Sequence, residues 1–251
     1  MTPGTTLDRP GRDALAASLT PHGLMVRGGF VPRDDDGLPP LPGGAAPGML
    51  WLVGVVGSSF WPHFTASAEY RDGQPDPLDR WSRRIGESLA QQWGGAALFP
   101  FSGPPWLPFQ RWADRCEATE KSAMGLRIHP VYGLWHAYRF ALALPAPTPR
   151  ATLPGATMLE AAGPTAPVPG LAIQDICARC DGQPCLHTCP VDGYTVQGFD
   201  LNACASHLRT PEGQVCMTDG CRARAACPVG AEYRYSAEHA AFHMAAFLRS
   251  H

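Results

Sequence analysis

Cysteine is distributed so unevenly along this chain that it decides what the last third can form. Residues 177–227 hold eight of the nine cysteines, whereas residues 1–176 hold only Cys116. The clustered cysteines form two groups, Cys177-x2-Cys180-x4-Cys185-x3-Cys189-Pro190 and Cys216-x4-Cys221-x5-Cys227-Pro228, with Cys204 between them. Clustered cysteines in a reducing compartment bind metal more often than they form disulfides, so we expect a metal or cluster site here.

The two Cys-Pro steps favour iron–sulfur clusters. A cubane needs four thiolates that converge from different directions, and a proline after the last cysteine turns the chain away from the site. In two-cluster ferredoxins the cysteine before proline ligates the other cluster. The expected [4Fe–4S] ligand sets are therefore Cys177, Cys180, Cys185 and Cys227 for one cluster, and Cys189, Cys204, Cys216 and Cys221 for the other.

Two other uses of these cysteines stay open. The gaps are longer than in the standard ferredoxin run, although the Asp-Gly-Gln-Pro sequence at 181–184 is turn chemistry that lets extra length bulge outward. One alternative is a pair of structural zinc sites, but zinc ribbons use paired C-x2-C knuckles and only one such pair occurs here. The other is a disulfide framework. Cys116 lies on a predicted helix and is expected to be a free buried thiol.

Length and charge limit the remaining possibilities. The 251 residues suffice for one large domain or two modest ones, and the formal net charge of -2 favours neither nucleic acid nor an anionic membrane as partner. Met1 to Asp13 has no apolar signal region, and no apolar run reaches the roughly 20 residues that span a bilayer. We therefore expect a cytoplasmic protein.

Strand and helix patterns alternate ahead of the cysteines and predict an α+β fold. Helices are expected at 12–19, from an Asp76 cap and Pro77 to about 93, and at 106–118, with strands at 49–56 and within 134–144. The acidic run at 34–36 is expected to be a solvated loop. The expected division is a first domain at 1–145, a Pro/Ala-rich connector at 146–175, a ferredoxin-like domain at 176–232 and a helix capped by Ser236 at 233–251.

One stretch of the first region resembles a known family. The segment Ile128-His129-Pro130-Val131-Tyr132-Gly133-Leu134-Trp135-His136-Ala137-Tyr138-Arg139, ending at Leu144-Pro145, resembles a signature stretch of the cblC-type vitamin B12 processing and trafficking proteins. Weaker matches in the same order are Pro21-His22-Gly23-Leu24, Leu41-Pro42-Gly43 and Asp76-Pro77-Leu78-Asp79. That family is similar in fold to flavin nitroreductases and binds cobalamin. The resemblance implies cobalamin contacts from His129, Tyr132, Gly133, Trp135 and Arg139.

The combination of the two regions is itself a known architecture. Epoxyqueuosine reductases and reductive dehalogenases join a cblC-like cobalamin domain to a ferredoxin domain with two [4Fe–4S] clusters and this order of cysteines. Epoxyqueuosine reductases carry a proton-donating Asp upstream of this stretch, where this chain has Phe101-Ser102-Gly103-Pro104 and no carboxylate. The chain departs from them at the residue that their reaction requires.

These observations lead to one expected function and two alternatives. The expected function is an oxidoreductase that passes electrons from an external donor (a flavodoxin, ferredoxin or reductase) through two clusters to the cobalt of bound cobalamin or a related corrinoid, removing its upper ligand. The first alternative is a cobalamin-dependent reductase of an organic substrate, with His129, Tyr132 or His136 as proton donor. The second is a ferredoxin-type electron carrier without cobalamin. No catalytic residue is assigned from the sequence.

Overall fold

The computed structural model describes residues 11–146, 175–195 and 198–251. They form two compact units. The first contains the described residues up to 55, then 60–117 and 137–146, and the second contains 56–59, 118–136 and the described residues from 175 onward. Residues 118–136 thus belong with the cysteine-rich region, although the sequence division placed them in the first domain. The expected connector, 146–175, lies outside the described residues except at its ends.

A four-stranded sheet forms the centre of the first unit. Its order is β1 (Met25–Phe30), β2 (Pro47–Val56), β6 (His136–Pro145) and β3 (Ala96–Leu98). β1 is antiparallel to β2, and β3 is antiparallel to β6. The β1 register shifts at Gly28, whose φ is +142° and whose missing Cβ would lie 2.7 Å from Cβ of Cys116. Glycine here therefore permits both the bulge and the close approach of the neighbouring helix.

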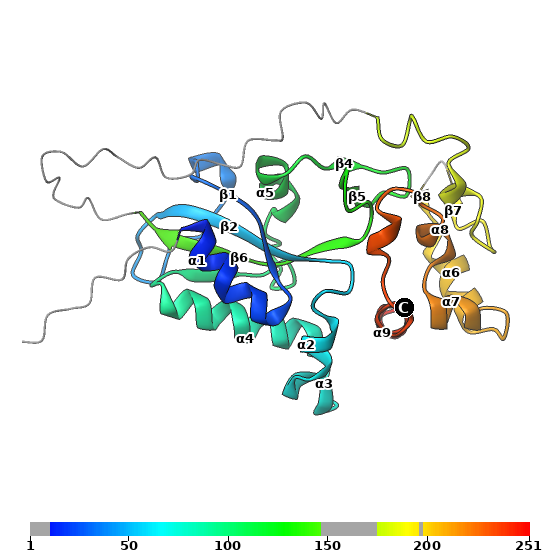
Figure 1. The fold of residues 1–251 in the computed structure, drawn as a ribbon, viewed down its shortest axis with the longest axis horizontal. Helices are drawn as coiled ribbons and strands as arrows, with labels where there is room; N and C mark the ends of the chain where they lie inside the picture. Colours follow the sequence, from blue (N-terminus) through cyan, green and yellow to red (C-terminus); the bar gives the residue numbers. More distant parts are fainter. Residues whose placement is uncertain (1–10, 147–174, 196–197) are drawn as a thin grey trace, which may run out of the picture. The chain divides into compact units, whose positions relative to one another are not determined.

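Helices cover both faces of this sheet (Figure 1). Ala141 and Ala143 of β6 pack with Trp112 of α5 (Phe109–Cys116) in one buried cluster. Phe140, on the other face of the same strand, lies against Gly86 of α4 (Pro77–Gln92). Successive strand side chains point to opposite faces, so α4 and α5 lie on opposite sides of the sheet. The smaller helices are α1 (Arg12–Leu19), η1 (Thr20–His22) and η2 (Asp34–Asp36).

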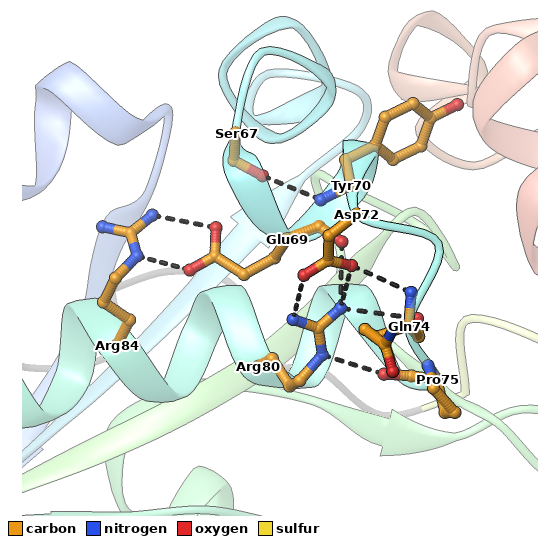
Figure 2. Close-up of polar contacts among 8 residues, drawn as sticks. All are labelled: Ser67, Glu69, Tyr70, Asp72, Gln74, Pro75, Arg80 and Arg84. Carbon is orange, nitrogen blue, oxygen red and sulfur yellow. Dashed lines mark hydrogen bonds and ion pairs between the residues drawn. The ribbon is translucent and has the colours of Figure 1, made fainter.

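Helices α2 (Trp61–Thr65) and α3 (Ala68–Arg71) precede α4. Two arginines of α4 hold α3 and the turn that follows it, as Figure 2 shows. Arg80 donates to both carboxylate oxygens of Asp72, at 2.8 and 2.7 Å, and to the carbonyl of Pro75. Arg84 pairs with Glu69, and this hydrogen bond is the main cause that lowers the pKa of the Glu69 carboxyl. These contacts fix the N-terminal half of α4 to the preceding turn.

The second unit is built from short elements around the cysteines. They are β4 (Glu120–Lys121), β5 (Arg127–Ile128), η3 (Pro184–Leu186), β7 (Tyr194–Thr195), β8 (Gly198–Phe199), α6 (Leu201–Leu208), α7 (Gln214–Asp219), α8 (Arg222–Ala225), η4 (Ala231–Tyr233) and α9 (Ala237–Arg249). β4 pairs with β5 and β7 pairs with β8, each antiparallel. No helix in the described part of the chain is long and apolar enough to cross a bilayer.

The elements predicted from the sequence are present, with three differences of detail. The expected mixed fold of helices and strands is confirmed, and the helix expected at 106–118 begins only at Phe109. Asp76 does not cap α4 through its side chain, because its backbone has φ +50° and Pro77 alone begins the helix. The acidic run at 34–36 is solvated only in part: it forms η2 with Asp34 and Asp35 exposed, as expected, but Asp36 departs from the expectation. Asp36 is buried, accepts from the Arg33 amide and pairs with Arg115.

The cap of the last helix provides a local test of stability. Ser236 Oγ accepts a hydrogen bond from the backbone N–H of His239 at 3.4 Å, as the sequence predicts for an N-cap. Replacing Ser236 with Ala removes this acceptor and is expected to destabilise α9 by about 1 kcal/mol. Hydrogen exchange of the first-turn amides of α9 measures the effect. Ser236→Asp supplies another capping oxygen and should leave exchange close to the original rate; equally fast exchange in both variants would contradict the prediction.

Candidate functional site: two sets of cysteines

Four of the cysteines surround one cavity of the second unit. Cys177 and Cys180 lie in the turns that begin the described cysteine region, Cys185 lies in η3, and Cys227 follows α8. All four line the same small cavity, together with Ile128 and residues of the adjoining loops. Helix α8 ends at Ala225, and the chain then brings Cys227 and Pro228 to the first group. These are the four cysteines that the ferredoxin pattern assigns to one cluster.

The other four cysteines line a second, larger cavity. Cys189 precedes Pro190, Cys204 lies on α6, Cys216 lies on α7 and Cys221 is the residue before α8. This cavity has a volume of about 680 Å³. All nine cysteines of the chain are free thiols, so the structure contains none of the disulfides of the alternative framework.

Cys185 and Cys204 show that thiols of one set act on one another electrostatically. Burial raises the pKa of the Cys185 thiol, and the other three members of the first set raise it further. Burial and the other three members of the second set raise the pKa of Cys204 to about 11. Four thiolates held this close repel one another, so they ionise together only when bound cations offset their charge.

A single metal ion and a cubane require different spacings of their cysteine sulfurs. Among the described residues, no group of three or more His, Cys, Asp or Glu side chains is placed to hold one metal ion. A tetrahedral zinc site with Zn–S bonds of about 2.3 Å would hold its sulfurs about 3.8 Å apart. The four cysteines of a cubane bind different irons, so their sulfurs lie further apart. Each set of four cysteines lines one cavity, and a cubane would need its four ligands around one such space.

Backbone amides point at a sulfur in each set. The N–H of Ala123 donates to Sγ of Cys177 at 3.4 Å, and the N–H of Gly193 donates to Sγ of Cys189 at 3.3 Å. Such N–H···S bonds stabilise thiolate charge and are one of the features that set the reduction potential of a cluster. The Ala123 contact was not foreseen from the sequence, because it joins residues that are far apart in the chain.

Comparison of the sequence with family models and with curated proteins returns no match. The likeness to cblC-type proteins and to two-cluster reductases consequently rests on the motifs quoted above, and the structural description of the site rests on the contacts of this chain.

Cys116 stands apart from both sets. It is the last residue of α5, is buried against the sheet of the first unit and lines neither cavity. Burial raises the pKa of its thiol to about 12, so the group remains protonated at neutral pH. The predicted free buried thiol is confirmed.

The segment expected to contact cobalamin forms a tight turn in the second unit. His129 and Gly133 exchange backbone hydrogen bonds, and His129 Nδ1 accepts from the amides of Val131 and Tyr132. The rings of His129 and Tyr132 stack with their centroids 4.3 Å apart. Gly133 has φ +56°, and a Cβ there would lie 1.9 Å from the carbonyl oxygen of Val229. The close approach that glycine permits is therefore to the segment after Cys227.

Trp135 and Arg139 are also engaged inside the protein. Trp135 is 5% exposed and packs beneath the guanidinium of Arg224, 4.6 Å from the ring centroid. Arg139 lies in the first unit and pairs with Asp79 at 2.6 Å, and it donates to Ser82 at 2.9 Å. As the structure has them, Gly133, Trp135 and Arg139 do not fit the role of an open surface for a corrin ring.

A close pair of histidines, buried His239 and half-buried His243, was missed by the sequence reasoning. His239 Nε2 lies 2.9 Å from His243 Nε2, and His239 Nδ1 lies 2.9 Å from Ser58 Oγ. Burial, with His243 next in importance, lowers the pKa of His239 to about 3, so this ring is neutral at physiological pH. The signal was present in the sequence: the two histidines are four residues apart, which places them on one face of a helix.

Proposed function

We propose that this protein is an iron–sulfur oxidoreductase that binds two [4Fe–4S] clusters and transfers single electrons through them. The observation that carries the proposal is the division of eight free thiols into two sets of four, each around its own cavity. The ligands would be Cys177, Cys180, Cys185 and Cys227 for the first cluster and Cys189, Cys204, Cys216 and Cys221 for the second. An external flavodoxin, ferredoxin or reductase would supply the electrons.

We further propose cobalamin as the electron acceptor, on the resemblance of residues 128–145 to cblC-type proteins. Bound cobalamin would supply a cobalt centre able to accept these electrons, and a lower oxidation state of the cobalt would weaken its bond to the upper ligand. The part of the chain in this reaction is to bind the clusters through its cysteines and to shield them from water. The described contacts of Gly133, Trp135 and Arg139 lie within the protein, so the proposal assigns cobalamin no contact residues.

The acceptor is tested by anaerobic reaction of the cluster-loaded protein with hydroxocobalamin. We expect chemically reduced protein to remove the upper ligand about tenfold or more faster than the same reductant does in free solution, a barrier lower by about 1.4 kcal/mol. The visible spectrum of cobalamin follows the reaction. Cys177→Ala/Cys180→Ala removes two ligands of the first cluster and should abolish most of the acceleration, whereas Cys116→Ser should retain it.

The alternatives give different results in the same experiment. Intact clusters with no acceleration would show that cobalamin is not the acceptor and would leave an electron carrier. Turnover of epoxyqueuosine-containing RNA by the loaded protein would favour a reductase of an organic substrate.

A further inference from the structure

Two exposed cations lie at the cavity of the second cysteine set. Lys121 and Arg222 are both exposed, and both line that cavity. Neither side chain forms an ion pair or a hydrogen bond within the part of the chain that the structure describes. No Asp or Glu is among the described residues that line the cavity. The two charges are therefore available to carboxylates of another molecule.

The acidic residues next to this surface in the sequence already have partners. Glu120 precedes Lys121, and its carboxylate accepts hydrogen bonds from the amides of Asp175 and Ile176. Asp200 caps α6 by accepting from the amide of Ala203 at 2.9 Å. These carboxylates stabilise local backbone, so they do not take the place of a partner for the two cations.

Exposed apolar side chains lie at the same cavity. Leu126 is 44% exposed and Phe199 is 41% exposed, and both line the cavity with Lys121 and Arg222. All four residues belong to the second unit. Protein interfaces combine an apolar centre with a polar or charged rim, and these four residues supply both parts. We call them the docking surface.

The docking surface is connected to a cysteine of the second set through aromatic rings. The ring centroids of Phe199 and Tyr194 lie 5.1 Å apart, and the Tyr194 hydroxyl is hydrogen-bonded to the Cys221 thiol. Arg222 directly follows Cys221 in the chain. The cavity of the first set, in contrast, has a volume of only about 20 Å³ and no charged residue in its described lining. The second set is therefore the one that an acidic partner can approach.

We propose that a small acidic electron-transfer protein binds the docking surface and exchanges electrons with the second cluster before the first. Its carboxylates pair with Lys121 and Arg222, and apolar atoms around its redox group pack on Leu126 and Phe199. One electron passes from the reduced partner to the oxidised cluster, and no proton or chemical group moves with it. The inference rests on the proposed function, because it needs a cluster in the second set.

The test measures how fast a partner protein reduces the clusters. Cluster-loaded full-length protein is mixed anaerobically with a reduced flavodoxin of strongly negative net charge, and the cluster absorption is followed by stopped flow. Lys121→Glu should lower the second-order rate constant about tenfold at low salt, and the difference should shrink as salt screens the charges. Lys121→Arg keeps the charge and should keep the rate.

The matched control places the same charge reversal beside the first set. Arg179 is exposed, precedes Cys180 and lines neither cavity. Arg179→Glu should therefore change the rate constant by less than about twofold, as expected for a charge outside the interface. Reduced methyl viologen, a small dication that needs no docking surface, should reduce the Lys121→Glu protein at least as fast as the original protein.

A cross-link locates the contact independently of the rate. Lys121 is the only lysine of the chain, so carbodiimide coupling to flavodoxin carboxylates should yield an amide at Lys121, identified by peptide mass. Lys121→Arg should lose this cross-link while it keeps the rate of reduction.

Four results would overturn the inference. They are an equal or larger loss of rate in Arg179→Glu, a Lys121→Glu rate that is unchanged at low salt, slowing of Lys121→Glu with methyl viologen as well, and binding of unrelated RNA that Lys121→Glu abolishes while flavodoxin reduction stays unchanged. Iron analysis separates these failures from failure of the proposed function, which protein that binds no iron would contradict.

Discussion

The iron content of a variant with two cysteines replaced is expected to depend on which two cysteines are changed. Protein loaded anaerobically should hold about eight iron and eight sulfide per chain, the content of two cubanes. Cys185→Ala/Cys227→Ala removes two ligands of one set and should leave about four iron, because the other cluster keeps all its ligands. Cys185→Ala/Cys189→Ala removes one ligand from each set and should damage both clusters. Iron and sulfide analysis and the cluster absorption measure both outcomes.

This pair of variants distinguishes the proposed sets from sets read in simple chain order. If the first four cysteines in sequence shared one cluster, Cys185→Ala/Cys189→Ala would be the variant that keeps half its iron, and Cys185→Ala/Cys227→Ala would lose more. Cys116→Ser should change nothing, because Cys116 lines neither cavity. Tightly bound zinc in protein from iron-replete cells would contradict the cluster proposal in any variant.

The cysteine pattern allowed more of the site to be predicted than the rest of the sequence did. Ligand spacing and Cys-Pro steps are local features of the sequence, and they predict that Cys227 joins the first group of cysteines. In the structure Cys227 lines the same cavity as that group. Helix α4 was equally readable, since Leu78, Trp81 and Ile85 repeat with helical spacing and are all buried. Both inferences depend on residues that are neighbours along the chain or follow a fixed period.

Contacts between distant segments were not readable in this way. Asp36 lies in an acidic run that is typical of a solvated loop, yet Arg115, 79 residues further along the chain, pairs with it in the fold. Residues 118–136 likewise continue the first region in sequence but pack in the second unit. A sequence pattern indicates which residues are apolar or charged. It does not indicate which distant residue will bury an apolar side chain or neutralise a charge.

Replacing Gly133 with Ala is expected to destabilise the second unit more than any other single-methyl change proposed for it. The backbone of Gly133 has φ +56°, which costs a residue with Cβ about 1 to 2 kcal/mol. The added methyl would also meet backbone, 1.9 Å from the oxygen and 2.7 Å from the carbon of the Val229 carbonyl. Since Val229 follows Cys227 and Pro228, relief of this clash would displace a cluster ligand.

Gly125→Ala is the matched control for this substitution. Gly125 also belongs to the second unit and has φ +78°, but a Cβ there meets nothing within 4 Å. Gly125→Ala should lower the free energy of unfolding by only about 1 to 2 kcal/mol, the cost of its left-handed backbone conformation. Gly133→Ala should lower it by more than about 4 kcal/mol, because displaced backbone is among the few causes of so large an effect. Denaturant titration followed by loss of cluster absorption reports on this unit. Equal midpoints in the two variants would mean that the turn at 129–133 does not press on the segment after Cys227, and that Gly133 serves another purpose.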